Sequence, residues 1–130
     1  MEKYKLKITT RAEGEETVFF LDAALKYTQK GRVLTYFQGE GKTLFYLEEA
    51  RLSRSGDYGL ELTFDRKKQT LAKLTFGENT GLMPMDTLEY SLFETRDEIF
   101  IAIEYILRQE GGCQRMKVCM EAKKAVATVS

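Results

Sequence analysis

Apolar and polar residues alternate with a period of two along most of this chain. Residues 3–8 read KYKLKI and residues 60–65 read LELTFD. In a β-strand, successive side chains point to opposite faces, so this period predicts strands with one buried and one solvated face. The segments EEARLSRS and EAKKAVATV contain good helix formers but are too short to form stable helices alone. The pattern therefore predicts an all-β protein.

Turn sequences divide the alternating runs at intervals of about 8–12 residues, a spacing typical of antiparallel barrels and sandwiches. They include EGEE, QKGR, GEGK, SGDYG, GENTG and QEGG. We expect Pro84 to bend one long strand, and residues 123–130 to form a frayed tail on a single domain. The predicted strands are 2–11, 16–28, 31–38, 42–48, 49–55, 58–65, 69–76, 80–95, 98–109 and 113–122.

One arginine falls on an apolar face. In the predicted strand that ends at residue 55, every second residue from Ala50 is Ala50, Leu52 and Arg54. Burying an unpaired guanidinium costs several kcal/mol, so Arg54 needs partners or water. The favoured interpretation places Arg54 at the barrel end, bonded to carbonyls or a carboxylate. The alternative makes it the polar anchor of a ligand cavity. Asp22 and Glu104 are the candidate acidic partners.

The order and spacing of four segments resemble the YwiB-like family of uncharacterised bacterial proteins. They are VLTYFQ, RLSRSGDYGLELTF, GLMPMDTLEYSL and IAIEYIL. The most specific match is Arg54 with Gly56, followed by Gly81, Thr87 and Tyr105. The resemblance covers residues 17 to about 120 and implies a single lipocalin-like (calycin-type) antiparallel β-barrel of eight to ten strands. It implies no known activity.

The chain departs from the family pattern at two places. Gln38 stands two residues after Tyr36, where the family pattern has an acidic residue, and Ala24 stands where a glycine is expected. Any chemistry that the acidic residue performs in the family would therefore be in doubt here. Gly56 itself is best explained by a turn or bulge that needs positive φ.

Charge and cysteine content exclude several classes of function. The chain has 20 basic and 20 acidic residues, evenly divided between its halves, so we expect no nucleic-acid partner. No apolar run is long enough for a signal peptide or membrane span, so we expect a cytoplasmic protein with no membrane partner. With no histidine, a zinc site or catalytic triad has little support, and we expect no metal and no cofactor. Cys113 and Cys119, about 20 Å apart if on one strand, are expected to be free thiols.

Three functional hypotheses remain open, because a small barrel either fills its interior or holds one small ligand. The first is a non-enzymatic barrel that binds a small, partly apolar molecule. The second is a filled barrel that acts through self-association, as a homodimer, or through a partner protein. The third is a hydrolase or isomerase using Arg54, Glu104 and Tyr105, although nothing in the sequence calls for an enzyme. The candidate ligand-binding residues are Arg54, Tyr36, Gln38, Glu104, Tyr105 and Tyr90.

Overall fold

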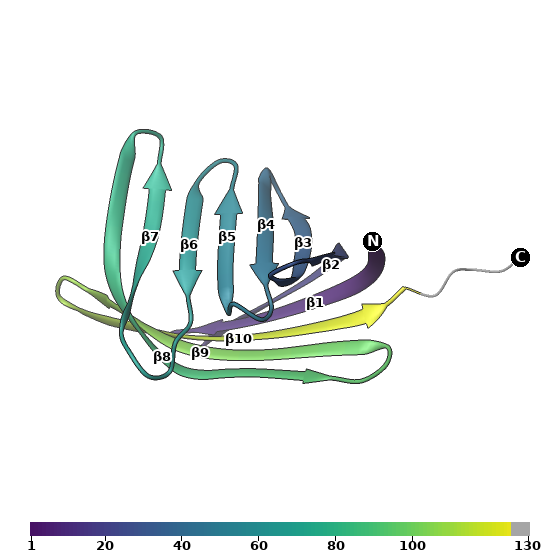
Figure 1. Ribbon diagram of the computed structural model, residues 1–130. Helices are drawn as coiled ribbons and strands as arrows, with labels where there is room; N and C mark the ends of the chain where they lie inside the picture. The colour runs from purple at the N-terminus through teal and green to yellow at the C-terminus, as the bar shows by residue number, and fades with distance from the viewer. Residues whose placement is uncertain (126–130) are drawn as a thin grey trace, which may run out of the picture.

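The computed structural model describes residues 1–125, which form a closed barrel of ten antiparallel strands (Figure 1). Each strand pairs with its neighbours in sequence, and β1 pairs with β10 to close the ring. The strands are β1 (Glu2–Ala12), β2 (Glu15–Thr28), β3 (Gly31–Gln38), β4 (Gly41–Tyr46), β5 (Arg51–Ser55), β6 (Gly59–Thr63), β7 (Thr70–Phe76), β8 (Asn79–Glu94), β9 (Glu98–Gln109) and β10 (Gly112–Lys124).

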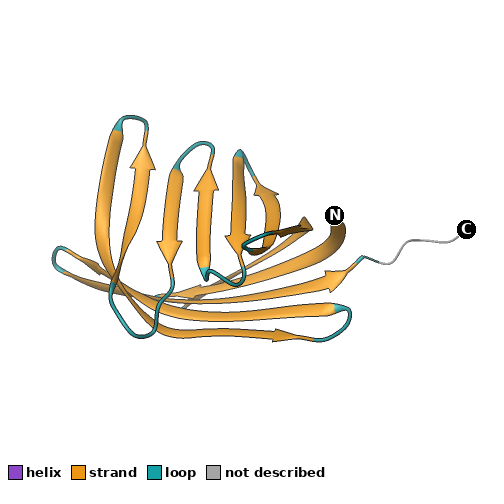
Figure 2. Cartoon of the chain, viewed as in Figure 1, coloured by secondary structure: helices purple, strands orange, loops and turns teal. Residues whose placement is uncertain are grey.

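The predicted all-β class and the ten predicted strands are confirmed, with small shifts at the strand ends. The described residues contain no helix, and so none that could cross a membrane (Figure 2). β10 runs two residues beyond its predicted end, and the amide of Ala125 donates a hydrogen bond to the carbonyl of Lys3. Residues 123–125 are therefore held in the sheet, while the rest of the predicted frayed tail, 126–130, lies outside the described residues.

The barrel is flattened into two layers that share two long strands. β3 to β7 form the upper layer of Figure 1, and β1, β9 and β10 lie in the lower layer. β2 pairs with β1 from Glu15 to Leu25 but with β3 only from Ala23 onward. β8 pairs with β7 up to Met85 and with β9 from Met85 onward, one residue beyond Pro84. β8 therefore changes from pairing with β7 to pairing with β9 at the position where the proline predicts a bend.

Stacked aromatic rings fill the middle of the interior. The ring centroid of Phe64 lies 6.4 Å from that of Phe45, 6.0 Å from that of Tyr90 and 5.5 Å from that of Tyr105. Aromatic pairs at these separations stabilise a core beyond the effect of buried area. Around them lie the largest fully buried side chains, Phe45, Leu6, Leu25, Leu34, Leu47, Met85, Ile101 and Met120.

One side of the barrel is sealed by contacts between β8 and the turns of the upper layer. The hydroxyl of Thr87 accepts a hydrogen bond from the amide of Asp65 at 3.1 Å, and the hydroxyl of Tyr90 donates to the carbonyl of Leu47 at 2.7 Å. On the other side, no hydrogen bond or ion pair among the described residues joins Glu15–Leu21 of β2 to the upper layer. We call this second side, where Glu15–Leu21 makes no hydrogen bond or ion pair with the upper layer, the open side.

The β3–β4 and β5–β6 turns, both at the upper end of Figure 1, pack closely on each other at Gly56. Its φ of +133° is accessible to glycine but rarely to other residues, which bears out the expected positive φ. A side chain at Gly56 would overlap the carbonyl oxygen of Glu40 in the neighbouring β3–β4 turn. Gly39 in that turn also has positive φ, at +61°, but faces open space.

We expect Gly56→Ala to lower the free energy of unfolding by about 2–3 kcal/mol, since it combines backbone strain with a backbone clash. Gly39→Ala is the matched control, with positive φ but no clash, and should cost only about 1 kcal/mol. Urea unfolding of both variants measures the difference. Equal costs would contradict the close packing of the two turns.

Candidate functional site

Arg54 faces the interior, as the alternation predicts. On β5 it pairs with Thr43 of β4, which in turn pairs with Tyr36 of β3. Both neighbours are buried, at 4% and 5% exposure, and the Arg54 side chain is 12% exposed. A row of three polar side chains therefore crosses the inner face of the upper layer and ends at the arginine.

The guanidinium of Arg54 is held by residues of the turn that follows it. Its Nη1 donates to the carbonyl of Tyr58 at 2.9 Å, and its Nη2 lies 2.8 Å from Oδ1 of Asp57. Its central carbon lies 3.7 Å from the centroid of the Tyr58 ring, a cation–π contact. The hydrogen bond from Arg54 lowers the pKa of Asp57 below its usual range. These contacts match the architectural interpretation of Arg54.

Neither predicted acidic partner reaches Arg54, so that expectation was wrong. The carboxylate of Asp22 lies on the outer face, 2.5 Å from Nζ of Lys5. Glu104 accepts a hydrogen bond at 2.6 Å from Nε of Arg115. It also faces outward, because its neighbour in β9, Tyr105, points inward and successive strand residues alternate. The set Arg54, Glu104 and Tyr105 is therefore not brought together.

Gly41 makes room for the buried arginine. It is the first residue of β4 and is buried. A methyl group at this position would overlap the guanidinium of Arg54. The second glycine of the GEGK turn, Gly41, is therefore required by packing against the arginine rather than by the geometry of the turn.

Three of the predicted tyrosines lie in the interior. Tyr36 is 5% exposed and Tyr105 is 7% exposed. Burial raises the pKa of Tyr36, Tyr90 and Tyr105 to about 12 in each case. For Tyr36, a hydrogen bond with Thr43 and the charge of Arg54 act in the opposite direction. Gln38 follows Tyr36 on the same face of β3, by strand alternation, and is half-buried.

Sequence reasoning missed a second inward arginine, Arg32. Its guanidinium pairs with Glu94 at the end of β8 and with Glu48 after β4, where its Nε lies 3.1 Å from the carboxylate. The hydrogen bond from Arg32 lowers the pKa of Glu94. Arg32 shares the β3 face of Tyr36, so the same alternation that indicates Arg54 could have found it.

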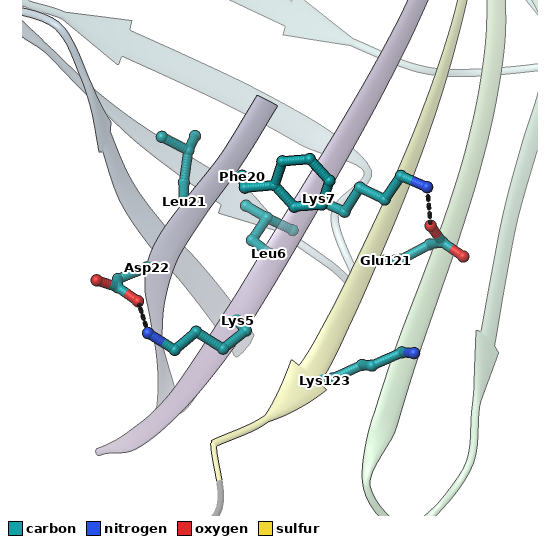
Figure 3. A pocket seen from close by; sticks show the side chains of 8 residues that line it. All are labelled: Lys5, Leu6, Lys7, Phe20, Leu21, Asp22, Glu121 and Lys123. Carbon is teal, nitrogen blue, oxygen red and sulfur yellow. Dashed lines mark hydrogen bonds and ion pairs between the residues drawn. The ribbon is translucent and has the colours of Figure 1, made fainter. Parts of the chain in front are cut away.

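The described residues contain no cluster of three or more His, Cys, Asp or Glu side chains placed to hold a metal ion. Cys113 and Cys119 are both on β10 and are free, as expected. The hollows found on the molecule lie on its surface. Two of them, of about 740 and 570 Å³, share Lys5 and Asp22 and open on the outer face of β1 and β2 (Figure 3 shows the former).

The same barrel occurs in a solved structure. The crystal structure of the YwiB protein from Bacillus subtilis superposes with a TM-score of 0.52, over 95% of this chain and 91% of that chain, at 13% sequence identity. The fold is that of YwiB. The predicted resemblance to the YwiB-like family is thus confirmed for the fold. No family model and no curated protein matches the sequence. At this identity, YwiB supplies no residue roles.

We expect Arg54→Met to lower the free energy of unfolding by about 1–3 kcal/mol, since it removes charge-assisted hydrogen bonds from a largely buried group. Arg51→Met is the matched control on the same strand. The Arg51 side chain is 38% exposed and pairs with Glu49, so its loss should cost less than about 0.5 kcal/mol. Thermal or urea unfolding measures both, and an Arg54 variant as stable as wild type would contradict its architectural role.

We expect alkaline pH to unfold the protein. Tyr4, Tyr36, Tyr90 and Tyr105 have pKa values of about 12 in the fold, against 10.0 for an ordinary tyrosine. Below pH 10 both states keep these protons, so stability is intact. Above it the unfolded chain loses them first, so stability falls between about pH 10 and 12. Phenolate absorbance should then rise together with loss of near-ultraviolet circular dichroism. Ionisation of all tyrosines before unfolding would contradict their burial.

Proposed function

We propose that this YwiB-like barrel is a non-enzymatic protein with a filled interior that self-associates through the free edge of β2. The observation that carries the proposal is the half of β2 from Glu15 to Asp22. It pairs with β1 on one side and with no described strand on the other. Unpaired backbone groups along a strand are a ready template for another chain.

This edge carries apolar side chains. Val18 is 40% exposed, Phe19 39% and Phe20 76%. Phe19 lies on the inner face at the open side of the barrel, opposite Ile8, while Val18 and Phe20 point outward. Exposed apolar residues beside unpaired backbone groups favour addition of a strand, since pairing would satisfy the backbone and cover the side chains together.

β8, the other long strand shared by the two layers, has a protected edge. In β8, a register shift in the pairing with β9, between Thr87 and Glu89, distorts the strand just after it leaves β7. The contacts from Thr87 and Tyr90 to the upper turns cover its second half. The free half of β2 has no proline and no register shift in its pairing with β1. The contrast supports a role for the β2 edge in association.

A second copy of the chain suits this edge. An antiparallel pair centred on Phe19 would place the apolar residues of one copy opposite those of the other, as a two-fold interface requires. At its ends, Asp22 of one copy would oppose Glu16 of the other. Asp22 is already paired with Lys5, and Glu16 with Arg11 at 2.8 Å, so each end is neutral overall. Because the contact is limited to one short strand segment from each copy, we expect a weak, concentration-dependent dimer.

We expect wild-type protein to show a monomer–dimer equilibrium in analytical ultracentrifugation. Val18→Lys with Phe20→Lys should weaken dimerisation at least tenfold, since lysines blunt a strand edge. The matched control is Leu71→Lys with Leu82→Lys, two leucines 58% and 60% exposed on β7 and β8. This control should dimerise as wild type does. A monomer at every concentration, or equal loss in both variants, would overturn the proposal.

A small, partly apolar ligand at the open side is the second candidate, favoured by Tyr105. Its side chain is 7% exposed, and its hydroxyl makes none of the hydrogen bonds found among residues 1–125. Inward apolar residues such as Leu60, Met83 and Met116 are only partly buried. We prefer the filled barrel because Arg54, the candidate anchor for a ligand, already bonds to Asp57 and to the carbonyl of Tyr58. Native mass spectrometry of purified protein separates the two: excess mass on the monomer supports a ligand, and a doubled mass supports the dimer.

A further inference from the structure

Folding gathers lysines on one outer face of the barrel, which we call the lysine face. It consists of the outward residues that line the two wide hollows over β10, β1, β2, β3 and β4. Six lysines line it against two carboxylates, Asp22 and Glu121. The lysines are Lys3, Lys5, Lys7, Lys26, Lys42 and Lys123. A chain with no net charge therefore carries a basic surface.

Most of this positive charge is not neutralised within the chain. Lys5 pairs with Asp22, and Nζ of Lys7 lies 3.7 Å from Glu121 (Figure 3). The other four lysines of the face have no carboxylate within ion-pair distance in the described part of the chain. A group of unpaired lysines around one hollow raises the local positive potential and attracts an anionic partner.

Two exposed aromatic rings lie among these lysines. Phe20 of β2 is 76% exposed and lies beside Lys7 (Figure 3), which it opposes across the β1–β2 ladder. Phe37 of β3 is 65% exposed, and Nζ of Lys42 lies 5.9 Å from its ring centroid. Neither ring takes part in the hydrophobic core of the described residues. Flat apolar rings beside cations are the combination that binds unpaired nucleobases by stacking and phosphates by charge.

We propose that the lysine face binds single-stranded nucleic acid. The lysines would contact phosphates, and Phe37, which lies outside the free half of β2, would stack on a base. A duplex hides its bases and would make no use of the rings. A flat bilayer suits a convex surface, whereas this face is hollowed, by about 570 Å³ between Lys3 and Lys42 alone. The even spread of charge along the sequence predicted no such partner. Five of the six lysines lie on the consecutive strands β1 to β4, and closure of the barrel through β1 and β10 adds Lys123.

Fluorescence anisotropy with a labelled oligouridylate, over a series of KCl concentrations, tests the proposal on the full chain. Four unpaired lysines predict a slope of log K against log[salt] of about −3. Lys26→Glu with Lys42→Glu should weaken binding at least tenfold and reduce the slope by about 1.4. The matched control, Lys67→Glu with Lys68→Glu in the exposed β6–β7 turn, changes net charge equally and should retain affinity.

Stacking is tested separately with Phe37→Ala. Loss of one stacked base should weaken binding roughly 5-fold to 100-fold. Phe93→Ala on β8 removes an equally exposed ring, at 67% against 65%, and should leave affinity unchanged. None of the residues changed in these variants lies in the free half of β2, so the result does not depend on self-association.

Several outcomes would overturn the proposal. One is the absence of oligouridylate binding at the lowest salt concentration. Another is an equal loss of affinity in the Lys26/Lys42 variant and in its Lys67/Lys68 control. Full affinity in Phe37→Ala would show that the face binds charge without reading bases. Competition by oligoglutamate, by duplex of equal length or by phosphatidylserine vesicles as strong as that by unlabelled oligouridylate would assign the face to another anionic partner.

Discussion

The barrel depends on neutralising the guanidinium groups that strand alternation turns inward. Arg32 lies at the start of β3 and Arg54 at the end of β5, so both stand near the ends of the interior, where a polar head can reach partners. Each is satisfied by the chain itself, Arg32 by Glu48 and Glu94, and Arg54 by the β5–β6 turn. Because breaking such a contact leaves a charge largely out of water, the partners and the glycine beside Arg54 are constrained together.

The saturation of these arginines moves the candidate function away from the interior. An anchor for an anionic ligand needs uncompensated positive charge, whereas the charge of Arg54 is already paired with Asp57 and its Nη1 donates to the carbonyl of Tyr58. The aromatic stack around Phe64 occupies the space beneath. What remains unsatisfied lies outside or at the open side: the backbone edge of β2 and the unpaired lysines. Unpaired backbone groups and uncompensated charges can still form favourable contacts with another molecule.

The sequence predicts local features of this fold better than features that depend on distant strands. Alternation predicts the ten strands and the inward direction of Arg54, because both follow from neighbouring residues. The same argument could have placed Glu104 outside, since Tyr105 next to it is inside. It could also have found Asp57, which is three residues after Arg54, within reach of a turn. The place of Lys123 in the lysine face could not be predicted, because this residue of β10 joins Lys5 of β1 only when the barrel closes.

Barrel closure therefore creates the surface as well as the core. Pairing β1 with β10 places Lys123 opposite Lys5, and pairing β3 with β4 places Phe37 opposite Lys42. An open sheet with the same sequence would leave Lys123 far from Lys5. Loss of the β1–β10 pairing would separate Lys123 and Glu121 from the lysines of β1, and it would also open the core that both layers share.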